Sequence, residues 1–349
     1  MITIMNEKLR KVSLILPVRN EALFIQQCLD AILKQDYTGP SEIIIVDGMS
    51  IDDTHIIIQE YQKKFVNIQL LDNPDKIVPT GMNRALRIAQ GDIIIRVDGH
   101  CIIAENYVRH CVEHIINKSA DGVGGPMETI GETQLSETIA IAMSSQFGVG
   151  NSAFRTISGK TMLVDSVPFP AYTRSIIERV GLYDEELVRN QDDEYNYRIR
   201  DIGGKILLAD NVRSKYYSRG SLSKLWKQYF QYGFYKIRVL QKHPRQMSLR
   251  QFIPPLFVAA LIFSLILTLL TPGGWIALLF VAGSYLLANL TASLITASRK
   301  GWRHIVVLPL TFAVLHLSYG LGFLTGLFHF WNRWNDKTGK VPVWKPNND

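Results

Sequence analysis

Cysteine is scarce in this sequence, with three among 349 residues. No two of them form a Cys-x-x-Cys pair or a zinc-ligand spacing, which argues against a disulfide framework and a structural zinc site. We expect Cys28, Cys101 and Cys111 to be reduced, buried thiols, as in a cytosolic domain. A glycine-rich phosphate loop followed by lysine is also missing near the N-terminus, which argues against a nucleotidyltransferase. The first apolar run, 12–18, is too short for a signal-peptide core, so we expect the N-terminus not to be exported.

Charged residues are missing from two stretches of the C-terminal third, 252–298 and 304–332. An apolar run of about 20 residues is long enough to cross the roughly 30 Å of bilayer hydrocarbon. The sequence therefore predicts a membrane domain over 251–331 and a polar tail over 332–349. It holds about three apolar spans, which cover residues 252–271, 275–297 and 304–330.

Acidic residues are missing from the segment just before the first span. Residues 213–250 carry ten Lys and Arg and no Asp or Glu, whereas residues 1–212 carry 21 Lys and Arg against 29 Asp and Glu. A basic belt beside an apolar span suits anionic headgroups or a diphosphate-bearing lipid, each basic residue contributing about 1 kcal/mol. A nucleic-acid patch is the alternative, but the adjoining spans argue against it. We expect membrane lipids as partners and no nucleic acid.

The third apolar run makes the topology ambiguous. Three full spans, with the N-terminal domain inside, would put the tail outside with Arg333, Lys337, Lys340 and Lys345, against the positive-inside rule. Glycines at 320, 322 and 326 would let this run break into a re-entrant pair, or would serve as a packing face between helices. His316 and His329 have no acidic partner in the spans, so we expect them to be packing or interfacial residues.

Strand and helix patterns alternate along the first hundred residues. Short apolar runs at 12–18, 42–46, 68–71 and 92–97 read as strands, and amphipathic segments up to residue 33, at 53–65 and at 80–89 read as helices. Such alternation predicts an α/β fold with a mostly parallel, helix-covered sheet. We place this domain at residues 1–212 and a basic amphipathic juxtamembrane segment at 213–250. Further helices are expected at 173–180 and 195–200.

Polar residues sit just past the carboxyl ends of these strands, where α/β sheets bind ligands. Asp98-Gly99-His100 is the most specific group, because alternating residues of an extended segment point to the same side. A carboxylate and an imidazole there would suit a divalent metal, and imidazole favours Mn²⁺ over Mg²⁺. A strand-end Asp and His are equally explained as turn formers. Asp47 and Glu21 are candidates for a base and a ribose, although each alone is equally explained as a helix N-terminal carboxylate.

An acidic run, Asp192-Asp193-Glu194, precedes a helical pattern. Such runs are usually solvated charge near a helix N-terminus. Crowded against one another or against a diphosphate, the carboxylates would repel, and one pKa would rise toward that of a general base. The spacing leaves both interpretations open.

Four stretches resemble family 2 glycosyltransferases of the GT-A fold: LILPVRNEALFIQQCLDAIL, EIIIVDGMSIDDT, GMNRALRIAQGDIIIRVDGHC and VGLYDEELVRNQDDEYNYRIRDIGGKI. The resemblance covers roughly residues 11–240, and RVDGHC with LWKQYFQYGFYK before apolar spans is similar to succinoglycan-type exopolysaccharide enzymes. It implies a Rossmann-like GT-A domain followed by transmembrane helices. It also implies a nucleotide-sugar site formed by Pro17, Arg19, Glu21, Asp47 and Asp98, a metal held by Asp98 and His100, and Asp192 as catalytic base.

The sequence departs from the family pattern at three places. Asp47-Gly48-Met49-Ser50 replaces the usual Asp-Asp-Gly-Ser, so the recognition of uridine depends on Asp47 alone. Gln191 replaces the acidic residue that usually precedes the catalytic base. The Gln-x-x-Arg-Trp motif of processive synthases lacks its Arg-Trp here, which favours single addition. Aromatic and amide side chains in this stretch are candidates for binding the acceptor sugar or for anchoring at the interface: Trp226, Gln228, Tyr229 and Tyr232.

Together these features predict an inverting transferase that moves a hexose from a UDP-sugar to a polyprenyl-diphosphate-linked saccharide, with Mn²⁺ or Mg²⁺. We expect a multi-pass protein of the bacterial inner membrane, with a cytosolic catalytic domain and contacts to other glycan-synthesis enzymes. The alternatives are a processive polysaccharide synthase and an inactive membrane scaffold that keeps the fold.

Overall fold

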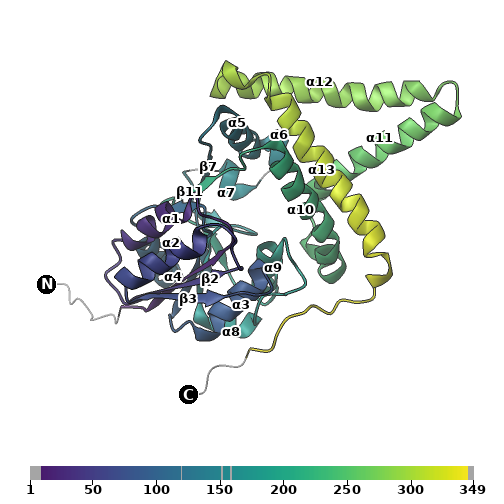
Figure 1. The fold of residues 1–349 in the computed structure, drawn as a ribbon. Coiled ribbons are helices and arrows are strands. Elements are labelled where there is room, and N and C mark those ends of the chain that lie inside the picture. Colours follow the sequence, from purple (N-terminus) through teal and green to yellow (C-terminus); the bar gives the residue numbers. More distant parts are fainter. Residues whose placement is uncertain (1–8, 119, 151, 158, 345–349) are drawn as a thin grey trace. The chain divides into compact units, whose positions relative to one another are not determined.

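The protein is described by a computed structural model, which covers residues 9–118, 120–150, 152–157 and 159–344. It divides into two compact units (Figure 1). The first unit comprises Met1–Met127, Ile157–Tyr216 and Lys340–Asp349, and the second comprises Glu128–Thr156 and Tyr217–Gly339. This division differs from the sequence-based boundaries, because residues 128–156 group with the C-terminal helices.

The first unit is built on an eight-stranded mixed sheet in the order β3-β2-β1-β4-β9-β6-β10-β8. β1 pairs in parallel with β2 and β4, and β2 pairs in parallel with β3, whereas β9 runs antiparallel to β4 and β6. The strands are β1 (Val12–Val18), β2 (Ser41–Asp47), β3 (Ile68–Asp72), β4 (Ile93–Arg96), β6 (Gly122–Gly124), β8 (Met162–Leu163), β9 (Ala171–Thr173) and β10 (Ile206–Leu208). The expected α/β fold with a mostly parallel sheet is confirmed.

Helices alternate with these strands, as the purple and blue part of the ribbon shows (Figure 1). They are α1 (Ile25–Leu33), α2 (Thr54–Lys64), α3 (Val78–Ile88), α4 (Tyr107–Lys118), α8 (Arg174–Val180) and α9 (Gln191–Asp201), and a further antiparallel pair is formed by β5 (Cys101–Ile103) and β11 (Ser214–Tyr217). Thr80 was expected to begin a helix, but α3 begins at Val78 with Pro79 in its first turn, where proline's missing N–H costs nothing.

The three cysteines are free and buried. Burial raises the pKa of all three thiols, of Cys28, Cys101 and Cys111, so they are held as unreactive thiols in the core. The expectation of buried cysteines without a disulfide is confirmed.

The second unit is almost entirely helical. It holds β7 (Met127–Ile130) in part, α5 (Gln134–Met143), α6 (Gln146–Val149), α7 (Ala153–Thr156), α10 (Leu222–Lys242), α11 (Ile253–Leu270), α12 (Gly274–Lys300) and α13 (Leu308–His329), with 3₁₀ turns at Pro244–Gln246, Leu249–Phe252, Trp302–His304 and Trp331–Arg333. Three of its helices are long and apolar enough to cross a membrane: Leu249–Leu270, Gly274–Lys300 and Leu308–His329. They confirm the expected apolar C-terminal helices.

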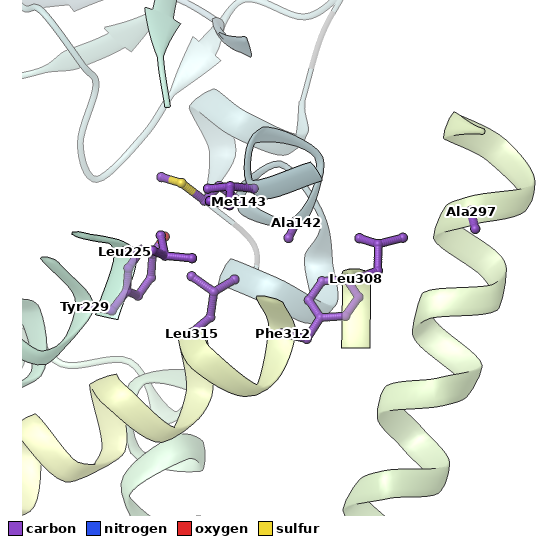
Figure 2. Packing of buried hydrophobic residues seen from close by; sticks show 9 residues of the cluster. Ala142, Met143, Leu225, Tyr229, Ala297, Leu308, Phe312 and Leu315 are labelled. Carbon is purple, nitrogen blue, oxygen red and sulfur yellow. The ribbon is translucent and has the colours of Figure 1, made fainter. Parts of the chain in front are cut away.

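A hydrophobic cluster joins α5, α10, α12 and α13 within the second unit (Figure 2). Met143 of α5, Tyr229 of α10, and Phe312 and Leu315 of α13 all belong to it. α13 is continuous, and a Cβ added at Gly322 would come within 2.0 Å of the carbonyl oxygen of Phe230 in α10. The glycines of the third apolar run therefore form a packing face, and a re-entrant break is absent from this helix.

Candidate active site

The loops after β1 and β2 are held together at the carboxyl edge of the sheet. Asn20 and Met49 both have positive φ, 55° and 56°, a conformation that non-glycine residues seldom adopt and that is found preferentially at functional sites. The Asn20 side-chain oxygen accepts from the backbone N–H of Ile51 at 2.9 Å, and the Asn20 N–H donates to the Ser50 hydroxyl at 2.9 Å. The geometry of one loop is thus fixed by the other.

Asp52 completes this junction. Its carboxylate accepts from the backbone N–H groups of Ala22 at 3.2 Å and Thr54 at 3.1 Å, and from the Thr54 hydroxyl at 2.5 Å. Burial would raise the pKa of the Asp52 carboxyl, but the hydrogen bonds from Thr54 and Ala22 outweigh it and lower that pKa below its usual value. Asp52 therefore stays ionised and holds Ala22 and the start of α2 together.

Asp47 is buried at the end of β2, with both carboxylate oxygens engaged. Oδ1 accepts from the Ser50 N–H at 3.1 Å and from its hydroxyl at 2.5 Å, and Oδ2 lies 2.9 Å from Nδ1 of His55. Each carboxylate oxygen has two acceptor sites, and the Ser50 N–H and hydroxyl occupy both on Oδ1, so a base N–H would bind at Oδ2. The role of Asp47 in base binding stays a prediction, and His55 is a neighbour that the sequence analysis missed.

Two further residues of the expected nucleotide site line the same edge. Pro17 is half-buried in β1 and Arg19 is exposed after it. A Cβ at Gly48 would lie 3.2 Å from Cβ and Cδ of Arg19. The absence of a side chain at Gly48 thus leaves room for the Arg19 stem beside Asp47.

Glu21 and His100 are joined directly. Glu21 Oε1 lies 2.9 Å from His100 Nδ1, and the imidazole packs edge-on against Tyr216 of β11 with ring centroids 4.8 Å apart. A Cβ at Gly99 would come within 2.9 Å of Glu21 Cγ, so a larger residue here would displace the Glu21 side chain. A neutral imidazole that donates from Nδ1 to Glu21 would present Nε2 as the lone-pair nitrogen, as metal-ligating histidines do.

Asp98 is held by Arg96, the last residue of β4. Asp98 Oδ1 accepts from Arg96 Nε at 3.0 Å and lies 3.0 Å from Arg96 Nη2. Both contacts use Oδ1, so Arg96 leaves Oδ2 unused. The ion pair fixes the orientation of a carboxylate that is itself partly exposed, at 24 %.

Asp192 lies in the first turn of α9, next to Asn190, which has a left-handed backbone with φ 60°. The Asp193 N–H donates to Asp192 Oδ1 at 2.9 Å. Burial alone would lower the pKa of the Arg96 guanidinium, but the charges of Asp98 and Asp192 outweigh it and raise that pKa above its usual value. Arg96 therefore contacts Asp98 directly, and the negative charge of Asp192 adds to the rise in the pKa of Arg96. The roles of Asp98 as metal ligand and of Asp192 as base stay predictions.

Glu194 has a different environment from Asp192. Its carboxylate is buried and accepts from Arg198 Nε at 2.7 Å and Nη2 at 3.1 Å, and the same guanidinium donates to the carbonyls of Val180 and Leu182. Glu194 is thus committed to holding α9 against the preceding loop.

Two buried polar atoms of this site lack a hydrogen-bond partner among the residues covered by the structure, Arg96 Nη1 and Gln191 Oε1. A buried polar group without a partner is costly and usually marks a place where a ligand or water binds. A guanidinium N–H suits a phosphate or sugar oxygen, and an amide oxygen suits a hydroxyl donor. The donor set therefore fits a polar, anionic ligand.

Within the described ranges no group of three or more His, Cys, Asp and Glu side chains has metal-binding geometry. The expected site needs only Asp98 and His100 from the protein, because Mg²⁺ and Mn²⁺ at phosphate sites take their remaining ligands from the phosphates and water. The lone-pair Nε2 of His100 and the Oδ2 of Asp98 fit that requirement.

The candidate acceptor residues belong to α10 of the second unit. Gln228 donates to the Tyr232 hydroxyl at 2.9 Å and accepts from Arg219 at 3.3 Å, and the Tyr229 and Tyr232 rings pack edge-on at 5.4 Å. Tyr229 is buried in the hydrophobic cluster, whereas Trp226 is 37 % exposed. Trp226 is therefore the more exposed of these two aromatic residues, and sugar stacking by any of these side chains stays a prediction.

Arg96 was missed by the sequence analysis. The only hint in the sequence is a charged residue closing the apolar run of β4, two residues before Asp98. Its pairing with Asp98 and its proximity to Asp192 depend on the fold.

We expect Arg96→Met to lower kcat by roughly 10²-fold with a smaller change in donor KM, because carboxylates displaced by about an ångström lose their alignment. Arg96→Lys should recover part of that loss, since it keeps the charge without the two-pronged contact. Steady-state kinetics with the full chain measures both.

Arg109→Met is the matched control, because the half-buried Arg109 makes the same two contacts to Asp36, each at 3.0 Å. It should behave as wild type. If kcat of Arg96→Met falls only in proportion to the fraction of unfolded protein, as measured by circular dichroism, Arg96 has a structural role and does not align the carboxylates.

The chain matches known proteins along most of its length. The sequence model described as "Glycosyl transferase family 2" matches residues 13–181. Succinoglycan biosynthesis protein ExoA of Rhizobium meliloti is 29 % identical over 92 % of this chain and 96 % of its own length. A dolichyl N-acetyl-alpha-D-glucosaminyl phosphate 3-beta-D-2,3-diacetamido-2,3-dideoxy-beta-D-glucuronosyltransferase of Methanococcus voltae is 29 % identical over 90 % of this chain and 97 % of its own length.

Among solved structures, the mannosyltransferase PcManGT of Pyrobaculum calidifontis, in complex with GDP-Man and Mn²⁺, superposes with a TM-score of 0.57 at 18 % identity. The match covers 89 % of this chain and 87 % of that one, and it supports the GT-A fold. The resemblance seen in the sequence is thereby confirmed. The chain is a glycosyltransferase of the GT-A fold, and its residues 13–181 form a family 2 glycosyltransferase domain.

Proposed function

We propose that this enzyme is an inverting, metal-dependent hexosyltransferase that uses a nucleotide-sugar, with UDP-sugar as the first candidate, and a lipid-linked saccharide acceptor. The observation that carries the proposal is a cluster of charged side chains. Arg96 forms an ion pair with Asp98, and Glu21 contacts His100. The charge of Asp192 contributes to the raised pKa of Arg96. A single base beside a metal-ligand pair is what direct displacement requires, without a protein nucleophile.

The residues divide the reaction between them. Asp98 Oδ2 and His100 Nε2 would hold a divalent cation, Mn²⁺ or Mg²⁺, which as a Lewis acid stabilises the charge developing on the leaving diphosphate. Asp192 accepts the proton of the acceptor hydroxyl while that oxygen bonds to the anomeric carbon and the bond to the diphosphate breaks. Configuration inverts because the attack comes from the face opposite the leaving group.

The nucleotide would lie at the edge formed by Pro17, Arg19, Glu21 and Asp47. Uridine is favoured by the resemblance to enzymes with a strand-end aspartate, whereas the archaeal mannosyltransferase structure contains GDP-Man. Because both Asp47 oxygens already accept hydrogen bonds, the base must share that carboxylate with Ser50 and His55. A donor panel therefore has to include guanosine as well as uridine sugars.

The acceptor side of the proposal rests on the relatives and on the apolar helices. One relative is a succinoglycan biosynthesis protein, and the other is named for transfer to a dolichyl-linked phosphate sugar. The first name supports a role in exopolysaccharide or cell-surface glycan assembly, and the second supports a lipid-linked saccharide as acceptor, although that name contains one phosphate. We propose a polyprenyl-diphosphate link because of the basic segment at 213–250. The enzyme would work at a bacterial inner membrane from the cytosolic side, alongside other glycan-synthesis enzymes and without nucleic acid.

The test is a screen of the detergent-solubilised full chain against UDP-, GDP- and dTDP-sugars with Mn²⁺, Mg²⁺ or EDTA. We expect one donor class to be hydrolysed slowly in a metal-dependent way, and a lipid-linked acceptor to gain one sugar, seen by mass spectrometry. Long polymer products would favour a processive synthase. Hydrolysis of no donor, by protein that is folded by circular dichroism, would favour the inactive scaffold.

A further inference from the structure

The C-terminal tail is bound to the first unit. The Lys340 N–H donates to Asp184 Oδ1 at 2.8 Å, and the Glu185 N–H donates to the Lys340 carbonyl at 2.9 Å. Both partners belong to the same compact unit as the candidate active site. Since one folded unit lies on one side of a membrane, the chain between Tyr217 and Lys340 must cross the bilayer an even number of times.

The beginning of α13 is also tied to the catalytic side. Just before α13, Arg303 Nη2 lies 2.5 Å from Glu137 Oε1 and buried His304 Nδ1 lies 2.8 Å from the Thr138 hydroxyl. Glu137 and Thr138 lie in α5, which has ten residues and is too short to cross. The segment 128–156 that contains α5 leaves and rejoins the first unit at Met127 and Ile157, so α5 is on that unit's side.

The end of α13 is anchored in polar surroundings. Fully buried Arg238 of α10 donates to the Gln241 side chain at 2.6 Å and to the backbone carbonyls of Arg333 and Asp336 at 3.4 and 3.3 Å. These carbonyls directly follow α13. The groups that hold the two ends of α13 therefore lie on the same side of the bilayer.

Between its ends, α13 packs along α10. A Cβ at Gly233 of α10 would come within 2.1 Å of the Tyr319 carbonyl oxygen, and one at Gly326 of α13 within 2.5 Å of that of Phe234. α10 carries Lys224, Lys227, Lys236, Arg238 and Lys242, and such charges are expensive in the hydrocarbon core. Because α13 lies against α10 along its length, the charges of α10 keep both helices out of the hydrocarbon core.

Burial separates α13 from the other two apolar helices. Half of its most apolar stretch, 50 %, is buried inside the protein, against 17 % for Leu249–Leu270 and 11 % for Gly274–Lys300. Its uncovered side still presents large apolar groups, Leu310 at 55 % and Phe328 at 78 % exposed, and Trp331 follows at 67 %. An apolar face of this kind, ending in tryptophan, suits the headgroup and acyl boundary.

We infer that α13 does not cross the membrane but lies along its surface, with its uncovered apolar face in the lipid interface and the C-terminal tail on the side of the catalytic unit. The bilayer is then crossed by the α11–α12 hairpin alone, which Figure 1 shows extending from α13. Lipid is the occupant because the same surface continues into the exposed apolar helices of that hairpin: a Cβ at Gly320 of α13 would lie 2.6 Å from the carbonyl oxygen of Pro254, in the first turn of α11. This differs from three full spans with the tail outside, and it does not depend on the substrate.

Cysteine accessibility tests the topology. Lys337→Cys reports on the tail, Gly273→Cys on the turn between α11 and α12, and Lys63→Cys on the catalytic unit; all three positions are exposed, and the native thiols are buried. In intact cells treated with a membrane-impermeant maleimide, we expect Gly273→Cys to react, and Lys337→Cys to be protected until permeabilisation, as Lys63→Cys is. If Lys337→Cys and Gly273→Cys react from the same side, α13 crosses and the inference fails.

Depth measurements test the lipid face. Nitroxide labels at Leu310, Leu317 and Phe328 of α13 should report similar, shallow depths in vesicles, from collision rates with oxygen and a nickel complex. A spanning helix would place Leu317 much deeper than the other two, since Leu310 and Phe328 lie about 27 Å apart along a helix. Full water exposure at all three would show that this face does not contact lipid.

Discussion

Asp192→Asn is expected to lower sugar transfer by roughly 10² to 10⁴-fold while donor affinity stays close to wild type. The amide keeps the shape of the side chain, including its acceptor oxygen for the Asp193 N–H at 2.9 Å, but it cannot take the proton of an acceptor hydroxyl. A positioned base is usually worth that factor. Single-turnover transfer together with donor-binding calorimetry would separate the chemical step from binding.

The neighbouring carboxylates provide the controls for this prediction. Asp193→Asn makes the same chemical change one residue further along α9 and should cost much less. Glu194→Gln should weaken the fold, because it removes the charge that Arg198 pairs with at 2.7 Å. Normal turnover by Asp192→Asn together with an inactive but folded Asp193→Asn would mean that the base is the wrong carboxylate.

The first strands of the sheet could be predicted from the sequence because β1, β2 and β4 are buried along almost their whole length. Continuous apolar runs such as residues 42–46 have few other uses in an α/β chain, and the structure extends that strand only by one residue at each end, to Ser41–Asp47. Helix starts were less predictable. The predicted helix at 80–89 begins two residues earlier, at Val78, with proline in its first turn.

The pairing of Arg96 could not be predicted, because it depends on which carboxylates the fold brings to the end of β4. The same limit applies to α5, whose sequence gives a short helix without indicating its partner. Ile139, Ala142 and Met143 acquire their role only when they pack with Leu308 and Phe312 of α13 (Figure 2). Long-range contacts of this kind leave no periodic signature.

Whether α13 crosses the membrane also could not be predicted from the sequence, because it depends on long-range contacts. Hydropathy measures how apolar a segment is, and a helix half-buried against other helices can be as apolar as one that faces lipid on all sides. α13 passes the same length and composition test as α11 and α12, although half of its apolar stretch is covered by protein. Two contacts distinguish α13 from α11 and α12, whereas composition does not: the hydrogen bond from the Lys340 N–H to Asp184, and the contact between Arg303 and Glu137.

Asp98→Ala is expected to abolish the metal-dependent part of donor binding and to lower transfer by about 10³-fold or more, since a metal at a departing diphosphate supplies several kcal/mol. The variant removes one of the two proposed ligands and also the partner of Arg96. Asp98→Asn keeps an acceptor for Arg96 and should lose metal dependence as well, which separates the ligand role from the positioning of Arg96. Calorimetry of UDP and GDP binding with and without Mn²⁺ measures the effect apart from activity.

Two comparisons make this result specific. Asp36→Ala removes a carboxylate that accepts from Nε of Arg109 in the same manner, at 3.0 Å, and should leave metal-dependent binding intact. His100→Asp replaces imidazole by a hard oxygen ligand and should shift the preference from Mn²⁺ toward Mg²⁺. If nucleotide binding in Asp98→Ala and His100→Asp depends on metal as it does in wild type, the ion is held elsewhere, and the Glu21–His100 pair must be explained as an internal support of the β1 and β4 loops.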